Sequence, residues 1–469
     1  MTIPVPADVI SRLKAVLGEG GWSQDPDRLA PKLVEWRDRW SGTTPLLVLP
    51  RSTAEVAAVV AICAESGTAI TPQGGNTGLV GGQIPDGEIL LSLERLRAVR
   101  EANVDDDVLI VEAGLTLAEA HDAAAAVGRR FPLSLASEGS CTIGGLISTN
   151  AGGVAVLRYG TMRQLVLGLE AVLPNGEVWN GLKRLRKDNT GYDLKQLLIG
   201  AEGTLGVVTA AALKLFPILA SRAVAIAGIE SPAAAVTLLS RAKDASGGAV
   251  ESFELIGRLG MELAIRHIPG AREPLESRPA WYVLIEIASG ERGAAEAAME
   301  RVLAAAMEDG LVLDAAIAQT ETQAKAFWAL RENQSAAQKS EGAAWKHDVA
   351  VPVSRIAEFL QLAGEALEAR YPGVRIDAFG HVGDGNIHYD VLSVPGGDAD
   401  THNGQREAAA HIVHDIVMSL GGSISAEHGL GTMKTAEALA YKSAAEIAAQ
   451  RAVRLALDPK RIMNPRVLF

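Results

Sequence analysis

The sequence predicts an α+β protein, and three observations lead to this prediction. Short apolar strands and amphipathic helices alternate along most of the 469 residues. Three glycine-dense turns lie between apolar strands in the first half of the chain. A histidine-bearing segment in the second half has the sequence of a β-hairpin. Because one domain usually holds about 100–200 residues, we expect two or three domains.

Residues 1 to about 40 look helical, and from Pro45 the pattern changes to alternating strands and helices. One helix should begin near Ser52 or Thr53, which are favourable N-cap residues, and should end at Gly67. Strands are expected at 46–50, 68–73, 88–93, 108–114 and 169–179, the last with a Pro-Asn-Gly turn. This alternation continues to about Pro217.

The second half has the same mixed character. Strands are expected at 223–230 and 281–289, and amphipathic helices around 232–245, 292–310 and 354–370. The last 50 residues are mostly helical. We therefore expect an N-terminal helical segment (1–39), a first domain (40–219), a second domain (220–420) and a C-terminal segment (421–469). No low-complexity linker separates them, so close packing is expected.

Composition excludes several classes of protein. The net charge of -12 argues against a nucleic-acid partner and against electrostatic docking on an anionic membrane. The sequence contains no run of about 18 apolar residues, so no transmembrane helix is expected. The N-terminus does not resemble a signal peptide. The two cysteines, Cys63 and Cys141, form neither a disulfide framework nor a CxxC site, which indicates a reducing cytoplasm.

The glycine-dense segments are 72–78 (PQGGNTG), 138–153 (EGSCTIGG, then TNAGG) and 200–206 (GAEGTLG). Glycine turns expose backbone N–H groups that bind anions such as phosphate. Their order is neither GxGxxG nor the Walker pattern, which disfavours a nicotinamide Rossmann domain and a P-loop ATPase. One such loop could be a simple surface turn. Three of them suggest a long cofactor lying against the backbone.

These segments, with LRYGTMRQLVLGLEAVLPNGE, KDNTGYDLKQLL and the ending NPRVLF, resemble the vanillyl-alcohol oxidase/p-cresol methylhydroxylase superfamily. The nearer resemblance is to its D-lactate and D-2-hydroxyglutarate dehydrogenase branch, from about residue 40 to the C-terminus. It implies a two-subdomain FAD-binding domain of p-cresol methylhydroxylase type, an α+β substrate (cap) domain and a helical C-terminal segment.

The resemblance also implies where FAD lies. The pyrophosphate would lie on Gly74–Gly78, the isoalloxazine and ribityl groups on 138–153, and the adenine half along 202–208. The residues assigned to FAD are Pro72, Gly74, Gly75, Asn76, Thr77, Gly78, Glu138, Gly139, Ser140, Thr142, Gly144, Gly145, Ser148, Asn150, Gly152, Glu202, Gly203, Val208 and Asn464. Since the 72–85 loop contains neither histidine nor cysteine, FAD is expected to be non-covalent.

The hairpin segment spans 377–392. A two-residue turn at Asp384-Gly385, the preferred pair for such a turn, would place His381 directly opposite His388. Opposed Cβ atoms lie roughly 4.5–5.5 Å apart, so both imidazoles could hold one divalent ion. Glu427 is the best candidate for a third ligand. Either histidine alone could be a hydrogen-bonded structural residue; the resemblance implies a divalent metal, usually zinc, at these positions.

His428, beside Glu427, is either a fourth ligand or a general base, and we favour the base because its ordinary pKa is near 6.5. The reaction implied is oxidation of a D-2-hydroxy acid to the 2-oxo acid, with hydride transfer to FAD. For the substrate carboxylates the resemblance implies Arg331 and Lys346, with His347 as a neighbour. Ser335 is expected one helical turn after Arg331. Without the resemblance, Arg331 would be read as paired with Glu332.

The sequence differs from the family pattern at one position. The D-2-hydroxyglutarate enzymes carry Asn two residues after the second histidine, where this chain has Asp390, which weakens the case for a dicarboxylate substrate. D-2-hydroxyglutarate is the leading substrate, and D-lactate the alternative. Further alternatives are a flavin oxidase, a metallohydrolase with structural glycine loops, and a non-catalytic flavin-binding protein. An electron-transfer flavoprotein or a quinone would accept electrons, and a homodimer is one option for assembly.

The other histidines carry little signal. His411 and His414 are read as surface or packing residues, while His121, His267 and His402 belong to no recognisable motif.

Overall fold

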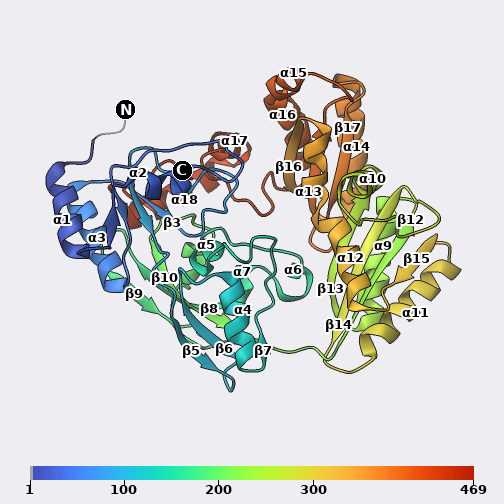
Figure 1. Cartoon of the computed structure of the whole chain (residues 1–469), viewed down its shortest axis with the longest axis horizontal. Coiled ribbons are helices and arrows are strands. Elements are labelled where there is room, and N and C mark those ends of the chain that lie inside the picture. The colour runs from blue at the N-terminus through green and yellow to red at the C-terminus, as the bar shows by residue number, and fades with distance from the viewer. Residues whose placement is uncertain (1–3, 469) are drawn as a thin grey trace. The chain divides into compact units, whose positions relative to one another are not determined.

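The computed structural model describes residues 4–468, which form two compact units. The first consists of the chain up to Gly153, of Gly160–Pro217, and of the chain from Glu427 on; the second consists of Val154–Tyr159 and Ile218–Ala426. Both helices and sheets are present in each (Figure 1), so the predicted α+β class is confirmed.

The first unit begins with a small sheet of four strands in the order β1-β2-β4-β3, in which β2, β4 and β3 are parallel. The elements are α1 (Ala7–Leu17), β1 (Trp22–Ser23), α2 (Pro26–Leu33), β2 (Leu47–Val48), α3 (Thr53–Ser66), β3 (Ile70–Gln73) and β4 (Ile89–Ser92). Helix α3 begins and ends as predicted. The Ser52 side chain accepts a hydrogen bond from the N–H of Glu55, and Gly67 adopts a left-handed conformation.

The larger sheet of this unit has five antiparallel strands in the order β5-β6-β10-β8-β9. Its strands are β5 (Val99–Asn103), β6 (Val108–Glu112), β8 (Val166–Val172), β9 (Val178–Gly181) and β10 (Val207–Lys214), and β7 (Arg129–Arg130) pairs separately with β11 (Phe216–Pro217). The remaining helices are α4 (Leu117–Ala126), α5 (Ile143–Ser148), α7 (Met162–Leu165), α8 (Lys195–Leu198), α17 (Thr435–Tyr441) and α18 (Ala444–Leu457).

The second unit is built on one antiparallel sheet of seven strands in the order β15-β12-β14-β13-β17-β18-β16. The strands are β12 (Ser221–Ile229), β13 (Val250–Gly257), β14 (Trp281–Ser289), β15 (Asp314–Ile317), β16 (Ala344–Ala350), β17 (Arg375–His381) and β18 (Asn386–Leu392). The helices are α6 (Val156–Tyr159), α9 (Pro232–Ser246), α10 (Arg258–His267), α11 (Ala294–Glu308), α12 (Glu321–Glu332), α13 (Gln334–Gln338), α14 (Ile356–Arg370), α15 (Ala399–Gly404) and α16 (Arg406–Ser419), with short 3-10 turns at Lys339–Glu341 and Val353–Arg355.

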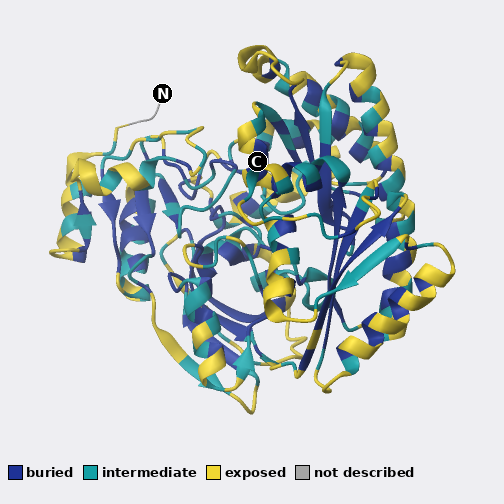
Figure 2. Ribbon diagram, turned by 45° about the vertical axis from the view of Figure 1, so that its right-hand side comes forward, coloured by how far each residue is buried: buried dark blue, intermediate teal, exposed yellow. Residues whose placement is uncertain are grey.

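Side chains of this sheet alternate between two faces. One face packs its apolar residues, among them Phe253, Ile285 and Tyr389, against α9, α11, α14 and α16. The other packs a smaller apolar cluster against α10 and α12 at the β12–β14 side, where Ile226 and Leu284 lie. In Figure 2 most strands of this sheet are dark blue, whereas exposed residues in yellow lie on the outer sides of the helices.

Among residues 4–468, no helix combines the length and the apolar character needed to cross a bilayer.

Candidate active site

The first two glycine-dense segments lie against each other at the end of β3. A Cβ at Gly75 would lie 1.8 Å from the carbonyl oxygen of Ser140, and a Cβ at Gly74 would lie 2.3 Å from Thr142 Oγ1. Only glycine permits such an approach. Thr142 Oγ1 is buried and has no hydrogen-bond partner among the described residues. A glycine-lined cradle beside an unsatisfied hydroxyl fits a bound polar group, as expected for the pyrophosphate of FAD.

The third segment and the C-terminal tail meet at the same place. The N–H of Glu202 donates to the carbonyl of Ser148 at 2.8 Å, and a Cβ at Gly203 would lie 3.1 Å from Pro72. Asn464 donates from Nδ2 to the carbonyls of Gly82 (2.9 Å) and Glu202 (2.8 Å). All residues assigned to FAD therefore belong to the first unit.

Several polar side chains assigned to FAD bond to the protein itself. Asn76 donates to the carbonyls of Pro31 and Val34, the side chain of Glu138 accepts from Ser134, and Asn150 Oδ1 accepts from Thr161 and from the N–H of Arg163. Ser148 Oγ donates to the carbonyl of Gly144, and Val208 is buried in β10. Much of the surface that these segments offer a ligand is consequently backbone.

Glu202 is the clearest example of a side chain that was assigned to FAD but bonds to the protein itself. Its carboxylate accepts the N–H groups of Leu430 (2.9 Å) and Gly431 (2.8 Å), and burial raises its pKa despite these two bonds. The side chain that the resemblance assigned to FAD thus holds the backbone just after Glu427 and His428.

The hairpin in the second unit differs from the predicted one. Four residues, Val382 to Gly385, connect β17 and β18, and the register places His381 opposite Asn386 and His388 opposite Phe379. The predicted two-residue turn and the directly opposed histidine pair are therefore wrong.

Contacts with neighbouring strands explain the longer loop. The N–H of Val382 donates to the carbonyl of Phe253 on β13, and the carbonyl of Gly385 accepts from the N–H of Val351 beyond β16. Both ends of the loop are therefore bonded outside the hairpin. The N–H of Gly385 closes the loop onto the carbonyl of His381.

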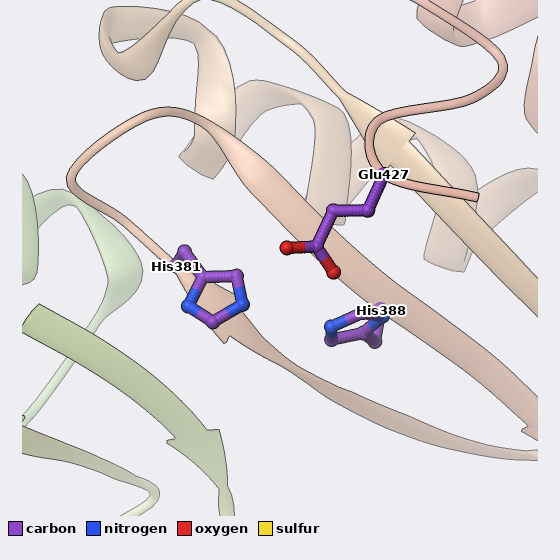
Figure 3. Close-up of side chains that lie close together, drawn as sticks. All are labelled: His381, His388 and Glu427. Atoms are coloured by element: carbon purple, nitrogen blue, oxygen red, sulfur yellow. The ribbon is translucent and has the colours of Figure 1, made fainter. Parts of the chain in front are cut away.

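The register moves by two residues, an even number, so the two histidines remain on one face of the sheet. Their ring centroids lie 5.8 Å apart. Glu427 directly follows Ala426, whose N–H donates to the carbonyl of Asp348 on β16. One ligand atom from each of His381, His388 and Glu427 lies within 4.8 Å of the others (Figure 3). Two imidazoles and a carboxylate are a ligand set that suits a catalytic zinc ion.

Two carboxylates that the sequence did not point to stand behind the histidines. Glu254, opposite His381 on β13, has Oε1 2.6 Å from His381 Nδ1, and Asp348 Oδ1 lies 3.8 Å from His388 Nδ1. Burial alone would raise the pKa of Glu254, but its interactions with His381 and Arg331 lower it overall. In the sequence, the only hint of a role for Glu254 was its position inside the largely apolar strand 250–257. The alternation of side chains along a strand does not show which partner such a glutamate has.

Arg331 is buried on α12 and bonds to Glu254, with Nε to Oε2 at 2.8 Å. Its ion-pair partner is therefore Glu254, and not the neighbouring Glu332 that the sequence without the resemblance would suggest. Helix α12 ends at Glu332, because the backbone of Asn333 no longer has helical dihedral angles. Ser335 is an exposed residue of the next helix, α13, and the expectation that it follows Arg331 by one helical turn is wrong.

Lys346 and Asp390 face each other across β16 and β18, with Nζ 3.1 Å from Oδ2, and Lys346 also donates to Gln338. Asp390 is directly opposite the buried Asp377. Burial, together with the charge of Asp390, raises the pKa of Asp377 to about 7. The carboxylate that departs from the family pattern is thus paired with a lysine that was expected to bind substrate.

Five of the remaining histidines contact other parts of the protein, and a sixth, His411, is exposed. His347 points to the opposite face, where its ring lies 5.4 Å from that of the buried His414. His402 stacks on Trp345 at 3.9 Å. His121 Nε2 bonds to the carbonyl of Leu133 and His267 Nε2 to Glu341.

Comparison with known proteins agrees with this picture. A model described as "FAD binding domain" matches residues 44–181, and "FAD linked oxidases, C-terminal domain" matches 218–468. The probable mitochondrial D-2-hydroxyglutarate dehydrogenase of Oryza sativa subsp. japonica is 38% identical over 98% of this chain and 81% of its own length. The D-2-hydroxyglutarate dehydrogenase of Xanthomonas citri pv. viticola is 37% identical over 93% and 91%.

Among solved structures, p-cresol methylhydroxylase with substrate bound has a TM-score of 0.75 at 15% identity, covering 99% of this chain and 98% of that chain. At this identity the likeness concerns the fold. The predicted superfamily and the FAD cofactor are confirmed.

The prediction of a cytoplasmic protein is wrong. The names of the relatives from Oryza sativa, Arabidopsis thaliana and Bos taurus all specify mitochondria, whereas the name of the Xanthomonas relative specifies no compartment. A low cysteine count reports the lack of a disulfide framework. It does not distinguish one reducing compartment from another.

Proposed function

Since the chain belongs to the family of FAD-linked oxidases and is an FAD-dependent oxidoreductase, we propose that it oxidises D-2-hydroxyglutarate to 2-oxoglutarate. One observation carries this proposal: His381, His388 and Glu427 gather in a chain that binds FAD. The Glu254 carboxylate, which links Arg331 to His381, supports it. A hydroxy acid offers a hydroxyl and a carboxylate, the two groups that such a site would bind.

We propose that His381, His388 and Glu427 hold a divalent ion, zinc first, and that FAD is bound without a covalent link. When bound, FAD accepts a hydride and the ion lowers the pKa of the substrate hydroxyl. Reoxidation by an electron-transfer flavoprotein or a quinone, rather than by oxygen, belongs to the same proposal.

The chain's own residues bind and orient the substrate. Arg331 keeps its terminal guanidinium N–H groups for a carboxylate, because its Nε is occupied by Glu254. Lys346 supplies a second cation, and Ser335 a hydroxyl at the periphery. His428 takes the hydroxyl proton, since an imidazole with an ordinary pKa near 6.5 is suited to a general base.

D-lactate is the second candidate, and Asp390 favours it. The Asp390 carboxylate lies 3.1 Å from Lys346 Nζ and neutralises its charge, which weakens the attraction of Lys346 for a second substrate carboxylate. A monocarboxylate would not need that cation.

Anaerobic flavin reduction by a panel of D- and L-2-hydroxy acids tests the proposed function. We expect the flavin bands to bleach with D-2-hydroxyglutarate but not with L acids, to stay unbleached after chelation, and to bleach again once zinc is restored. Acid precipitation should release the yellow colour into solution. Equal bleaching by L acids, or bleaching that ignores the chelator, would contradict the proposal.

In the same experiment His428→Asn tests the base. The variant should bind FAD and metal yet reduce the flavin about 10²–10⁴-fold more slowly. Near-normal reduction would remove this role from His428.

A further inference from the structure

Glu254 is a buried carboxylate whose two oxygens hold two different functional side chains. Oε1 lies 2.6 Å from His381 Nδ1, and Oε2 accepts from Arg331 Nε at 2.8 Å. The residue is fully buried and lies directly opposite His381 in the β13–β17 register. Its carboxylate therefore connects a strand of the hairpin with helix α12.

On the histidine side, the bond fixes the tautomer. A carboxylate accepts hydrogen bonds, so the proton of the His381 ring resides on Nδ1 and the lone pair of Nε2 is available to an ion. A carboxylate behind a histidine ligand orients the ring and raises its basicity.

On the arginine side, the same bond fixes the plane of the guanidinium. Arg331 Cζ lies 4.8 Å from the ring centroid of Phe379, so the group is held from its edge by Glu254 and from its face by Phe379. The terminal N–H groups keep a defined direction for binding a carboxylate.

We propose that Glu254 is a positioning residue that couples the metal ligand His381 to the substrate-binding Arg331, so that its loss weakens metal binding and substrate binding together. The substrate half rests on the proposed function. The metal half needs only the ligand set.

The same sheet offers a matched control in Glu286 on β14. This buried carboxylate also bridges an arginine and a ring N–H: it accepts from Arg222 at 2.8 Å and from Trp328 Nε1 at 2.8 Å. It lies on the same face as Glu254, but β14 pairs with β12 and β13 and not with the hairpin. A purely structural effect of losing a bridging carboxylate should therefore appear in both variants.

The experiment compares Glu254→Gln and Glu286→Gln in the FAD-loaded protein. Zinc affinity is measured by competition with a chromophoric chelator, together with Tm and with KM and kcat for D-2-hydroxyglutarate. In the first variant the amide NH2 faces either Arg331 or His381, so one partner loses its acceptor in either orientation. We expect zinc affinity to fall about 10–100-fold and KM to rise about tenfold or more. In Glu286→Gln both should stay within about twofold, although Tm falls.

Wild-type zinc affinity and KM in Glu254→Gln, with a Tm loss like that of Glu286→Gln, would overturn the proposal, and so would a wild-type protein that binds no zinc. If Glu254→Gln does not fold, Glu254→Asp replaces it: the shorter carboxylate should also weaken zinc binding, and unchanged affinity overturns the proposal. If the wild type oxidises no D-2-hydroxy acid, the proposed function fails. The zinc measurement then still decides the role of Glu254.

Discussion

The two faces of the seven-stranded sheet follow different physical rules, although single strands contribute to both. On β16 and β18, Trp345 and Tyr389 point into the apolar face, while Lys346, His388 and Asp390 point to the opposite face. The apolar face is stabilised by the close packing and burial of apolar side chains. The polar face keeps charged groups out of water and stabilises each by a partner of opposite charge or a hydrogen bond. The difference teaches that changes on the first face act through lost volume, whereas changes on the second act through the compensation of charge.

The largest expected effect comes from the apolar face. Trp345 is fully buried, packs edge-on against Tyr371 at 5.0 Å and donates from Nε1 to the carbonyl of His402 at 2.7 Å. Trp345→Ala should lower the free energy of unfolding by about 3–5 kcal/mol, because it leaves a cavity and an unsatisfied carbonyl. Urea unfolding measures the loss, and KM of the folded fraction should stay within about twofold. A raised KM at unchanged stability would break the comparison.

On the polar face the second largest effect should depend on pH. The pKa of Asp377 in the folded protein, about 7, exceeds the ordinary value near 3.9. Between about pH 4 and 7 the folded state therefore holds a proton that the unfolded chain has lost, and stability falls as pH rises through this window. Asp377→Asn removes this loss. At pH 8 the variant should be more stable on the order of 2–4 kcal/mol, since one pKa unit corresponds to about 1.4 kcal/mol.

Urea unfolding of both proteins at several pH values checks this prediction. The difference should shrink toward zero near pH 4, where the carboxyl is protonated in both states. An equal difference at every pH would show that the gain does not come from the titration of Asp377. The hydrogen bond donated by Gln338 would not explain it either, because the amide oxygen of the Asp377→Asn variant could accept the same bond.

The smallest effect should concern substrate choice. Asp390→Asn releases Lys346 from a partly exposed ion pair worth roughly 1 kcal/mol. KM for D-2-hydroxyglutarate should fall about fivefold, while KM for D-lactate should hardly change. Steady-state kinetics with both acids measures the ratio. An unchanged ratio would mean that Lys346 does not bind the second carboxylate.

Local signals made much of the fold predictable. Helix α3 could be placed from its N-cap Ser52 and its terminal Gly67, because capping depends on residues adjacent in sequence. Strands β12 and β14 were recognisable because they are continuous apolar runs. The hairpin register was predicted incorrectly, since Phe253 on β13 and Val351 just after β16, both distant in sequence, bond to the loop.

By itself, the sequence determined the α+β class and pointed to His381, His388 and Glu427, because these depend on residue type and on local patterning. The assignment of FAD to the glycine-dense segments came from the family resemblance. Only the tertiary structure decided which charged groups pair with the side chains of the site. Glu254 meets His381 across 127 residues and Arg331 across 77, and Lys346 meets Asp390 across 44. A buried charge takes its role from the partner that compensates it, and only the folding of distant strands onto one sheet chooses that partner.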